Sequence, residues 1–102
     1  MQQPFAPFAG VANTVNAAVT GTTAALALTA SSSVSCSVRI ANIGTQTIFI
    51  ALGDSTVTAV VATSMPVLAN TVEVFDKGAA THVAHIAGTT GSTLYATTGM
   101  GV

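Results

Sequence analysis

Apolar and polar residues alternate most regularly over residues 33–43. Every second residue there is apolar, namely Val34, Cys36, Val38 and Ile40, and the residues between them are serines and Arg39. Because successive side chains of a β-strand point to opposite sides, this pattern predicts a strand with one face in a core and one polar face. Residues 47–52 are apolar at both parities, which predicts a strand that is buried on both sides.

Further short runs carry strand patterns between turn residues. The pattern predicts strands at 57–63, 71–75, 81–87 and 92–97, and a possible strand at 22–29. In the 71–75 strand we expect Val72 and Val74 to face inward and Glu73 outward. Turns are expected at 53–55, 76–78 and 88–91, a loop around Met65-Pro66 at 64–70, and a glycine-rich tail at 99–102 that is not a strand. The sequence therefore predicts an all-β fold: a single β-sandwich, or a β-tulip or jelly-roll-like domain, of about seven short antiparallel strands.

Residues 1–21 do not share this regular pattern. Two prolines hold the backbone extended there, and two of the four phenylalanines of the chain lie beside them. Apolar spacing over residues 10–20 also fits a short helix, but the run is brief and contains β-branched residues that form helices poorly. We expect an extended N-terminal arm (1–21) before a β-sandwich domain (22–102). The arm residues expected to contact a neighbour are Pro4, Phe5, Pro7, Phe8, Val11 and Val15.

Charge is scarce in this sequence. Half of its 102 residues are hydrophobic, only 5% are charged, and the formal net charge is −1. Ordinary domains carry about 25% charged residues. A surface with so few charges of either sign favours association over solubility. We therefore expect much of it to be covered by copies of the chain or by a larger partner. The alternative is a free monomer whose many serines and threonines hydrate the surface.

The same scarcity argues against several partners. Arg39 and Lys77 are the only residues with a fixed positive charge, too few to neutralise a nucleic-acid backbone. Polar residues or glycine interrupt every apolar run, and no basic amphipathic stretch is present, so neither a spanning nor a surface-bound membrane segment is expected. The N-terminus lacks the basic region of a secretory signal, which indicates use without export by that route.

The candidates for chemistry are few, and none forms a convincing site. The lone Cys36 is expected to be a buried, inert thiol. His82 and His85 would point to opposite sides of a strand, so a shared metal is not expected and each is predicted to lie at a surface or interface. The three acids and the common serines show no catalytic spacing, and the glycine-rich segments lack a phosphate-binding lysine. We expect no catalytic residue, no metal and no cofactor, and so no enzyme.

Three segments carry a resemblance to a known class of proteins. Residues 37–44 (SVRIANIG), 48–54 (IFIALGD) and 65–75 (MPVLANTVEVF) resemble small virion proteins of tailed bacteriophages, over roughly residues 33–97. Such proteins are commonly head decoration, or cement, subunits with β-sandwich or β-tulip folds, often trimeric. The resemblance implies a homo-oligomer, with a trimer favoured, that binds the major capsid protein and strengthens the head. It also implies a protein made in the host cytoplasm and located at the capsid surface.

Two other functions stay open from the sequence. The first is a tail, neck or fibre component of the same virion, which differs in its copy number per particle. The second is a carbohydrate-binding β-sandwich. Sugar sites usually offer exposed aromatic rings, whereas this chain has no tryptophan and a single tyrosine, Tyr95. Binding of a glycan that depends on Tyr95 would favour that alternative.

Overall fold

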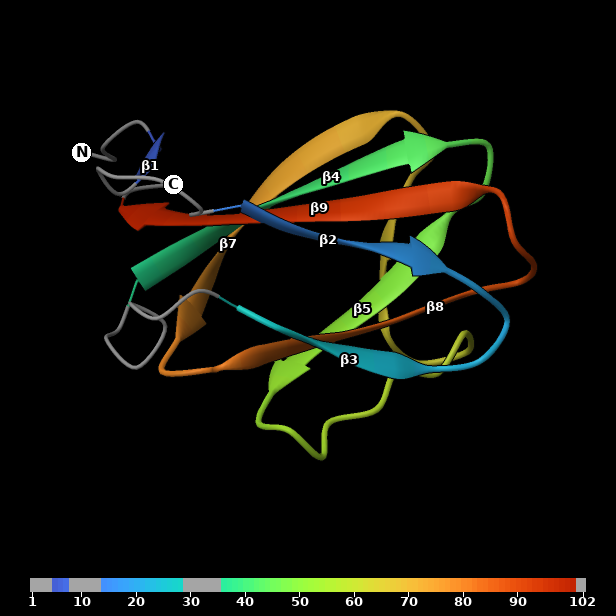
Figure 1. The fold of residues 1–102 in the computed structure, drawn as a ribbon, viewed down its shortest axis with the longest axis horizontal. Helices are drawn as coiled ribbons and strands as arrows, with labels where there is room; N and C mark the ends of the chain where they lie inside the picture. The colour runs from blue at the N-terminus through green and yellow to red at the C-terminus, as the bar shows by residue number, and fades with distance from the viewer. Residues whose placement is uncertain (1–4, 8–13, 29–35, 101–102) are drawn as a thin grey trace.

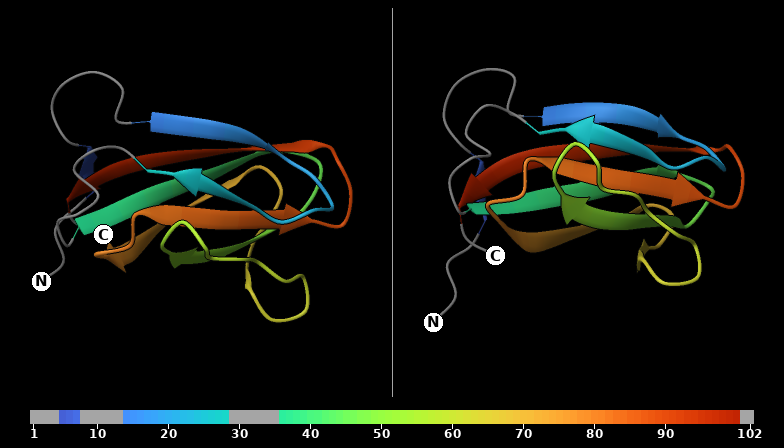
Figure 2. Two further views of the ribbon diagram at one scale, coloured as in Figure 1. Left: turned by 60° about the horizontal axis from the view of Figure 1, so that its bottom comes forward. Right: turned by 90° about the horizontal axis from the view of Figure 1, so that it is seen from below.

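The computed structural model describes residues 5–7, 14–28 and 36–100, and these residues form two antiparallel β-sheets with no helix among them (Figure 1). The strands are β1 (Ala6–Pro7), β2 (Thr14–Val19), β3 (Ala24–Ala27), β4 (Cys36–Gly44), β5 (Ile48–Gly53), β6 (Met65–Val67), β7 (Thr71–Gly78), β8 (His82–Ala87) and β9 (Ser92–Met100). The sheets face one another as two layers (Figure 2). The predicted all-β sandwich is therefore confirmed.

The strand order identifies the kind of sandwich. One sheet, here called sheet A, has the order β2-β9-β4-β7, with β1 also paired to β9; the other, sheet B, has the order β3-β8-β5-β6. The pairs are nested along the chain, since β2 pairs with β9, β3 with β8, β4 with β7 and β5 with β6. One long antiparallel hairpin thus rolls up into two four-stranded layers, which is the jelly-roll arrangement.

The core lies between the layers and is built from the predicted alternation. In β4, Val38 and Ile40 are fully buried while Arg39 between them is exposed. Sheet B contributes Ile48 and Ile50 from β5 and Val83 from β8. Each fully buried side chain of this size adds about 1.5–3 kcal/mol to the free energy of unfolding. None of the six residues of β5 is exposed, in agreement with the prediction of burial on both sides.

The predicted strand at 57–63 is wrong. Residues 54–64 form a connection in which the N–H groups of Thr63 and Ser64 both donate to the carbonyl of Val60. β5 already has β8 and β6 on its two sides, so this segment cannot pair with β5, the strand that it follows. The predicted loop at 64–70 is also corrected in part, because Met65–Val67 is the edge strand β6.

The predicted orientation of β7 is inverted. The register sets Glu73 opposite Ile40, on the core side of the sheet, and Val72 opposite Ala41, on its outer side. Glu73 is exposed nevertheless, because β7 is an edge strand. The strand also continues through the predicted turn at 76–78, and β9 continues to Met100, where no strand was expected. Pairing with β4 extends β7 as far as Gly78 and carries β9 through Gly99.

The segment 1–21 is extended wherever the structure describes it, but residues 14–19 are not separate from the sandwich. Strand β2 pairs with β9 along its whole length, and Val19 is fully buried in the core. The possible strand at 22–29 is the shorter β3. Together with β6, the strands β1 and β2 raise the number of strand segments above the seven expected.

Candidate interaction surface

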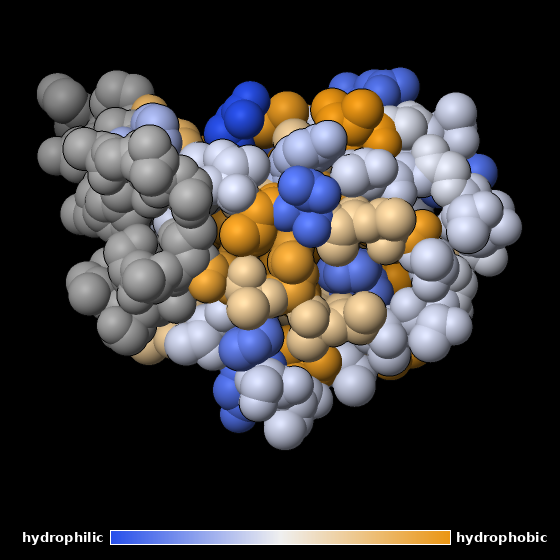
Figure 3. All heavy atoms as spheres, in the orientation of Figure 1, coloured by the Kyte–Doolittle hydropathy of each residue, from blue (hydrophilic) through white to orange (hydrophobic). Residues whose placement is uncertain are grey.

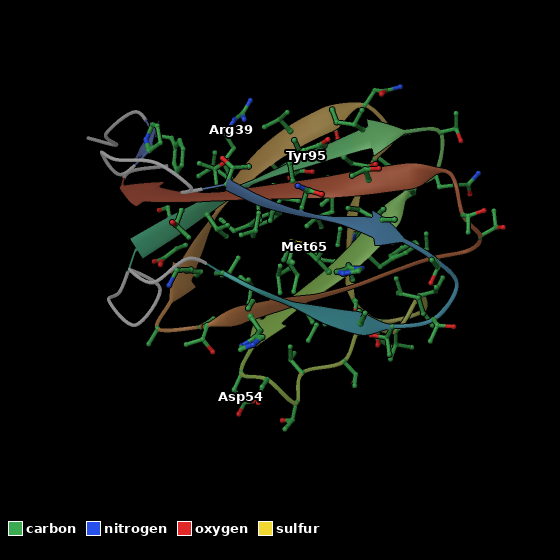
Figure 4. All side chains as sticks on the ribbon, viewed as in Figure 1. Arg39, Asp54, Met65 and Tyr95 are labelled. Atoms are coloured by element: carbon green, nitrogen blue, oxygen red, sulfur yellow. The ribbon has the colours of Figure 1, made fainter. Side chains whose placement is uncertain are left out.

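Three of the five charged residues belong to one strand, and the other two lie far apart, with Arg39 above sheet A and Asp54 below sheet B in Figure 4. Glu73, Asp76 and Lys77 belong to β7, Arg39 to the neighbouring strand β4, and Asp54 to the turn after β5. Lys77 is buried, and its Nζ donates hydrogen bonds to the carbonyl oxygens of Gly78 (3.2 Å) and Ala80 (2.9 Å). The exposed charges are therefore fewer still, and they leave wide areas of neutral surface.

The outer side of sheet A carries an uncovered apolar patch. The register aligns Tyr95 of β9, Ala41 of β4 and Val72 of β7 in one row across three strands. Tyr95 is 39% exposed, Val72 45%, and Ile43, which is two residues farther along β4 on the same side, 53%. Ala41 lies between these side chains and is itself buried. We call Tyr95, Val72 and Ile43, with Ala41 beneath them, the outer patch.

A single cation lies beside the outer patch. Arg39 and Ala41 are two residues apart in β4, so their side chains share the outer side of sheet A. In Figure 4, Arg39 and Tyr95 both project from this sheet, away from sheet B. Apolar side chains reach the surface along the upper border of Figure 3, over β4 and β7. The face thus combines the apolar row with threonines and with two charges of opposite sign, because Asp76 of β7 lies opposite Ser37 on the same side.

The outer side of sheet B is different, because the chain covers it itself. Ala84 of β8 points away from the core but is fully buried. The connection 54–64 crosses this side, where the N–H of Ala59 donates to the hydroxyl of Thr23, next to β3, at 2.8 Å. The outer side of sheet A instead keeps three large apolar side chains exposed, namely those of Tyr95, Val72 and Ile43.

A second group of exposed apolar residues lies around β6. Its members are Val60, Val61, Met65 and Leu68, and Leu68 is the most exposed at 58%. The carbonyl of Leu68 accepts hydrogen bonds from the N–H (3.3 Å) and the hydroxyl (2.7 Å) of Thr71, so this side chain is held outward by a turn. We call these four residues the β6 group.

The predicted arm residues are only partly described. Pro4, Phe8 and Val11 lie outside the described residues. Phe5 is half-buried, Pro7 is exposed in β1 opposite Gly99, and Val15 packs against the protein's own core. The sequence analysis did not predict the outer patch. The available signal was the pattern of β7, which has Val at 72 and 74 and Phe at 75 and therefore has apolar residues on both of its faces.

The two histidines point to opposite sides of β8, as predicted. His82 lies opposite Gly53, and its Nδ1 is 2.9 Å from the hydroxyl of Thr81. His85 lies opposite Ile50 on the core side and is buried, which corrects its expected surface position. Burial disfavours the charged ring and lowers the pKa of His85 below its usual value, and its Nδ1 has no hydrogen-bond partner among the described residues.

Chemistry is sparse in the part of the chain that the structure describes. No group of three or more histidines, cysteines or acids lies close enough there to hold a metal ion. Asp54 is fully exposed, and hydrogen bonds from the hydroxyl and N–H of Thr56 lower its pKa, so it is the cap of a turn. Cys36 opens β4, but its side chain is not described. Within the same residues, no helix has the length and apolarity needed to cross a membrane.

Comparisons with known proteins find similarity among solved structures. No protein-family model matches the sequence, and a search of curated proteins finds no match. Among solved structures, the chain is similar to one from work entitled "Bacillus endospore appendages form a novel family of disulfide-linked pili". The TM-score is 0.53 at 16% sequence identity, and the match covers 85% of this chain and 83% of the other. At that identity the similarity establishes the fold.

Proposed function

We propose that this protein is a non-enzymatic structural subunit that functions while packed against other proteins in a larger assembly. The observation that carries the proposal is the combination of an open apolar face with a near absence of charge. Seven large hydrophobic side chains are exposed among the described residues, whereas the whole chain has five charged residues. Large exposed apolar patches mark interaction sites, and charge is depleted at the centre of interfaces.

The outer patch has the composition of such an interface. Its aromatic residue, Tyr95, lies at the middle of the row, between Asn16 of β2 and Ala41 of β4. Aromatic residues surrounded by small and aliphatic ones are the usual anchors of protein contacts. The pilus protein with a similar fold supports the proposal by analogy, because a pilus is a fibre of repeated subunits, whereas a shared fold by itself does not transfer function.

Within this proposal, the specific candidate is a head decoration protein of a tailed bacteriophage that binds the major capsid protein. The sequence resemblance supports it, and so does a jelly roll, a fold used by viral capsid domains. A tail, neck or fibre component of the virion and a pilus-like fibre are the other assemblies that fit a neutral subunit. A carbohydrate-binding module is a further candidate, since Tyr95 offers one exposed ring on the open sheet.

The test is to find the protein in its native assembly. Lysates of the source cells are separated on a density gradient, and the fractions that contain the protein are identified by mass spectrometry and viewed by electron microscopy. We expect the protein to sediment with particles or filaments. Hundreds of copies per phage head would support decoration, a few to dozens would support a tail part, and filaments would support a fibre. Recovery only as free protein would contradict the proposal.

A further inference from the structure

The four edge strands of the sandwich differ in how they are protected. On one side, the edge strands are β6 and β7. Strand β6 has only three residues and contains Pro66, and β7 carries Glu73, Asp76 and Lys77, three of the five charged residues of the chain. Short length, proline and charge are the usual means by which a sheet edge avoids pairing with another chain. This side is therefore protected.

The opposite side has no charged residue in its strands, and its one proline among the described residues, Pro7, lies in the two-residue β1, which pairs with β9 beyond β2. Its edge strands are β2, with the sequence TVNAAV, and β3, with the sequence AALA. Neither contains a charged residue or a proline. Strand β2 is six residues long, which is about 20 Å of extended chain. In a protein with so few charges, their concentration on β7 leaves the β2–β3 side as the one open to strand pairing.

The exposed side chains on this open side are small. They are Thr14, Asn16 and Ala18 from β2, and Ala24, Ala25 and Ala27 from β3. None of these is long enough to keep a second strand away from the backbone. Figure 3 views this side, and apolar side chains show at the surface between β2 and β3. A strand added beside β2 would cover these apolar side chains, and its backbone would form hydrogen bonds with the edge of β2.

We propose that β2 is the site at which two copies of the chain join, by antiparallel pairing of β2 with β2 of the second copy. This inference rests on the proposed function, because it names one of the contacts that the assembling subunit makes. The charge pattern selects the partner. If β7 of a second copy paired with β2, its charged side chains would lose hydration without gaining a counter-charge. Strand β2 of a second copy is as neutral as its partner and has the same length.

The contact is self-complementary about a two-fold axis. With Asn16 on the axis, Asn16 meets its own equivalent, Thr14 meets Ala18, and Val15 meets Ala17. Residues of the outer side then meet outer residues, and core-side residues meet core-side residues, so sheet A continues from one copy into the other. Such a contact builds dimers, and it predicts an even number of copies where the phage resemblance implies three.

A charge on the edge tests the proposal. Ala18→Lys places an ammonium group on the exposed side of β2, and Leu68→Lys places the same group in the β6 group on the protected side. Multi-angle light scattering over a range of concentrations gives the mass of each variant, and circular dichroism confirms its fold. We expect the natural chain and Leu68→Lys to reach twice the mass of 10.0 kDa, and Ala18→Lys to stay at the monomer mass. Association of Ala18→Lys equal to that of the natural chain overturns the inference.

Single cysteines give a second test that does not depend on a disruptive charge. Thr14→Cys, Asn16→Cys and Ala18→Cys are made in a Cys36→Ser chain and oxidised. Self-pairing predicts that the position nearest the axis forms a disulfide-linked dimer in much higher yield than the other two. Equal yields at all three, or none, overturn the inference. A failure of β2 pairing would leave the proposed function intact if the protein still sediments with particles or filaments. The disulfide test and the sedimentation test therefore distinguish a failure of this inference from a failure of the proposed function.

Discussion

Asn42 joins the two sheets of the sandwich through its buried amide. This residue of β4 is fully buried, and its Nδ2 donates to the carbonyl of Val67 in β6 at 2.9 Å and to that of Gln46 at 2.8 Å. Val67 is itself fully buried. One side chain of sheet A thus satisfies a backbone carbonyl of the edge strand of sheet B, beside the turn from β4 to β5.

Removal of this amide should be costly. Asn42→Ala removes this donor from the carbonyl of Val67, whereas that of Gln46 still accepts from the hydroxyl of Ser92 (2.8 Å). We expect the free energy of unfolding to fall by about 1–3 kcal/mol. Asn42→Asp should be worse, because a carboxylate has no proton to donate and would face two carbonyl oxygens in the core. Urea unfolding at low concentration measures both. Asn16→Ala on the exposed side of β2 is the matched control, and a change there as large as that of Asn42→Ala would contradict this account.

Two glycines with positive φ should respond differently to the same substitution. Gly44 has φ +143°, and a Cβ there would collide with the carbonyl oxygen of Gly91 and with Ser92 of β9. We expect Gly44→Ala to lower the free energy of unfolding by about 3 kcal/mol or more, since backbone would have to move. Gly78, with φ +57°, has open space around it, so Gly78→Ala should cost only about 1–2 kcal/mol. Equal losses in urea unfolding would contradict the steric explanation.

Acid should destabilise the fold through His85. Because burial lowers the pKa of this ring in the folded state, the unfolded chain binds more protons as the pH falls below about 6.5. The stabilisation is complete above that pH and is lost as the pH falls toward the folded-state pKa, by at most about 1.4 kcal/mol per pH unit.

The pH dependence can be assigned by comparing the two histidines. Thermal unfolding of the natural chain, His85→Leu and His82→Leu is measured from pH 7.5 to 5. We expect His85→Leu to flatten the loss of stability over this range, whereas His82→Leu should keep it. An unchanged slope in His85→Leu would show that another group is responsible.

The outer patch should be needed for assembly but not for folding. Val72 and Ile43 are about half exposed, so Val72→Lys and Ile43→Lys together should change the free energy of unfolding by less than about 1 kcal/mol. We expect the same pair to reduce cosedimentation with native particles or filaments at least tenfold, because two ammonium groups would have to be desolvated. Thr58→Lys, exposed in the connection 54–64, is the control. Full cosedimentation of the double variant would remove the outer patch from the interface.

Local pattern was enough to find most strands. The strands predicted at 33–43, of which 36–43 are described, and at 92–97 were recognised because one face packs in the core, which imposes a period of two on the sequence. The strand at 47–52 was recognised from apolar residues at both parities, and 81–87 from its strand-forming residues between turns. The alternation of side chains along a strand also predicted that His82 and His85 point to opposite sides of β8. It did not show that His85 faces the core, because that depends on which face of β8 meets Ile50. The sequence analysis singled out Tyr95 as the one tyrosine of the chain. That it lies in a row with Ala41 and Val72 follows only from the register of three strands that are distant in sequence.

The sequence by itself determined an all-β chain, its scarcity of charge and the turns after β5 and β8. The tertiary structure decided which extended segments have partners. Residues 57–63 are rich in β-branched residues but follow β5, whose two sides are taken by β8 and β6. Residues 14–19, in contrast, pair with β9, and 65–67 with β5. It also decided that β7 carries Val72 outward and that the charges protect one side of the sandwich only. The physical reason is that strand hydrogen bonds and edges are made between distant segments, so no local pattern records them.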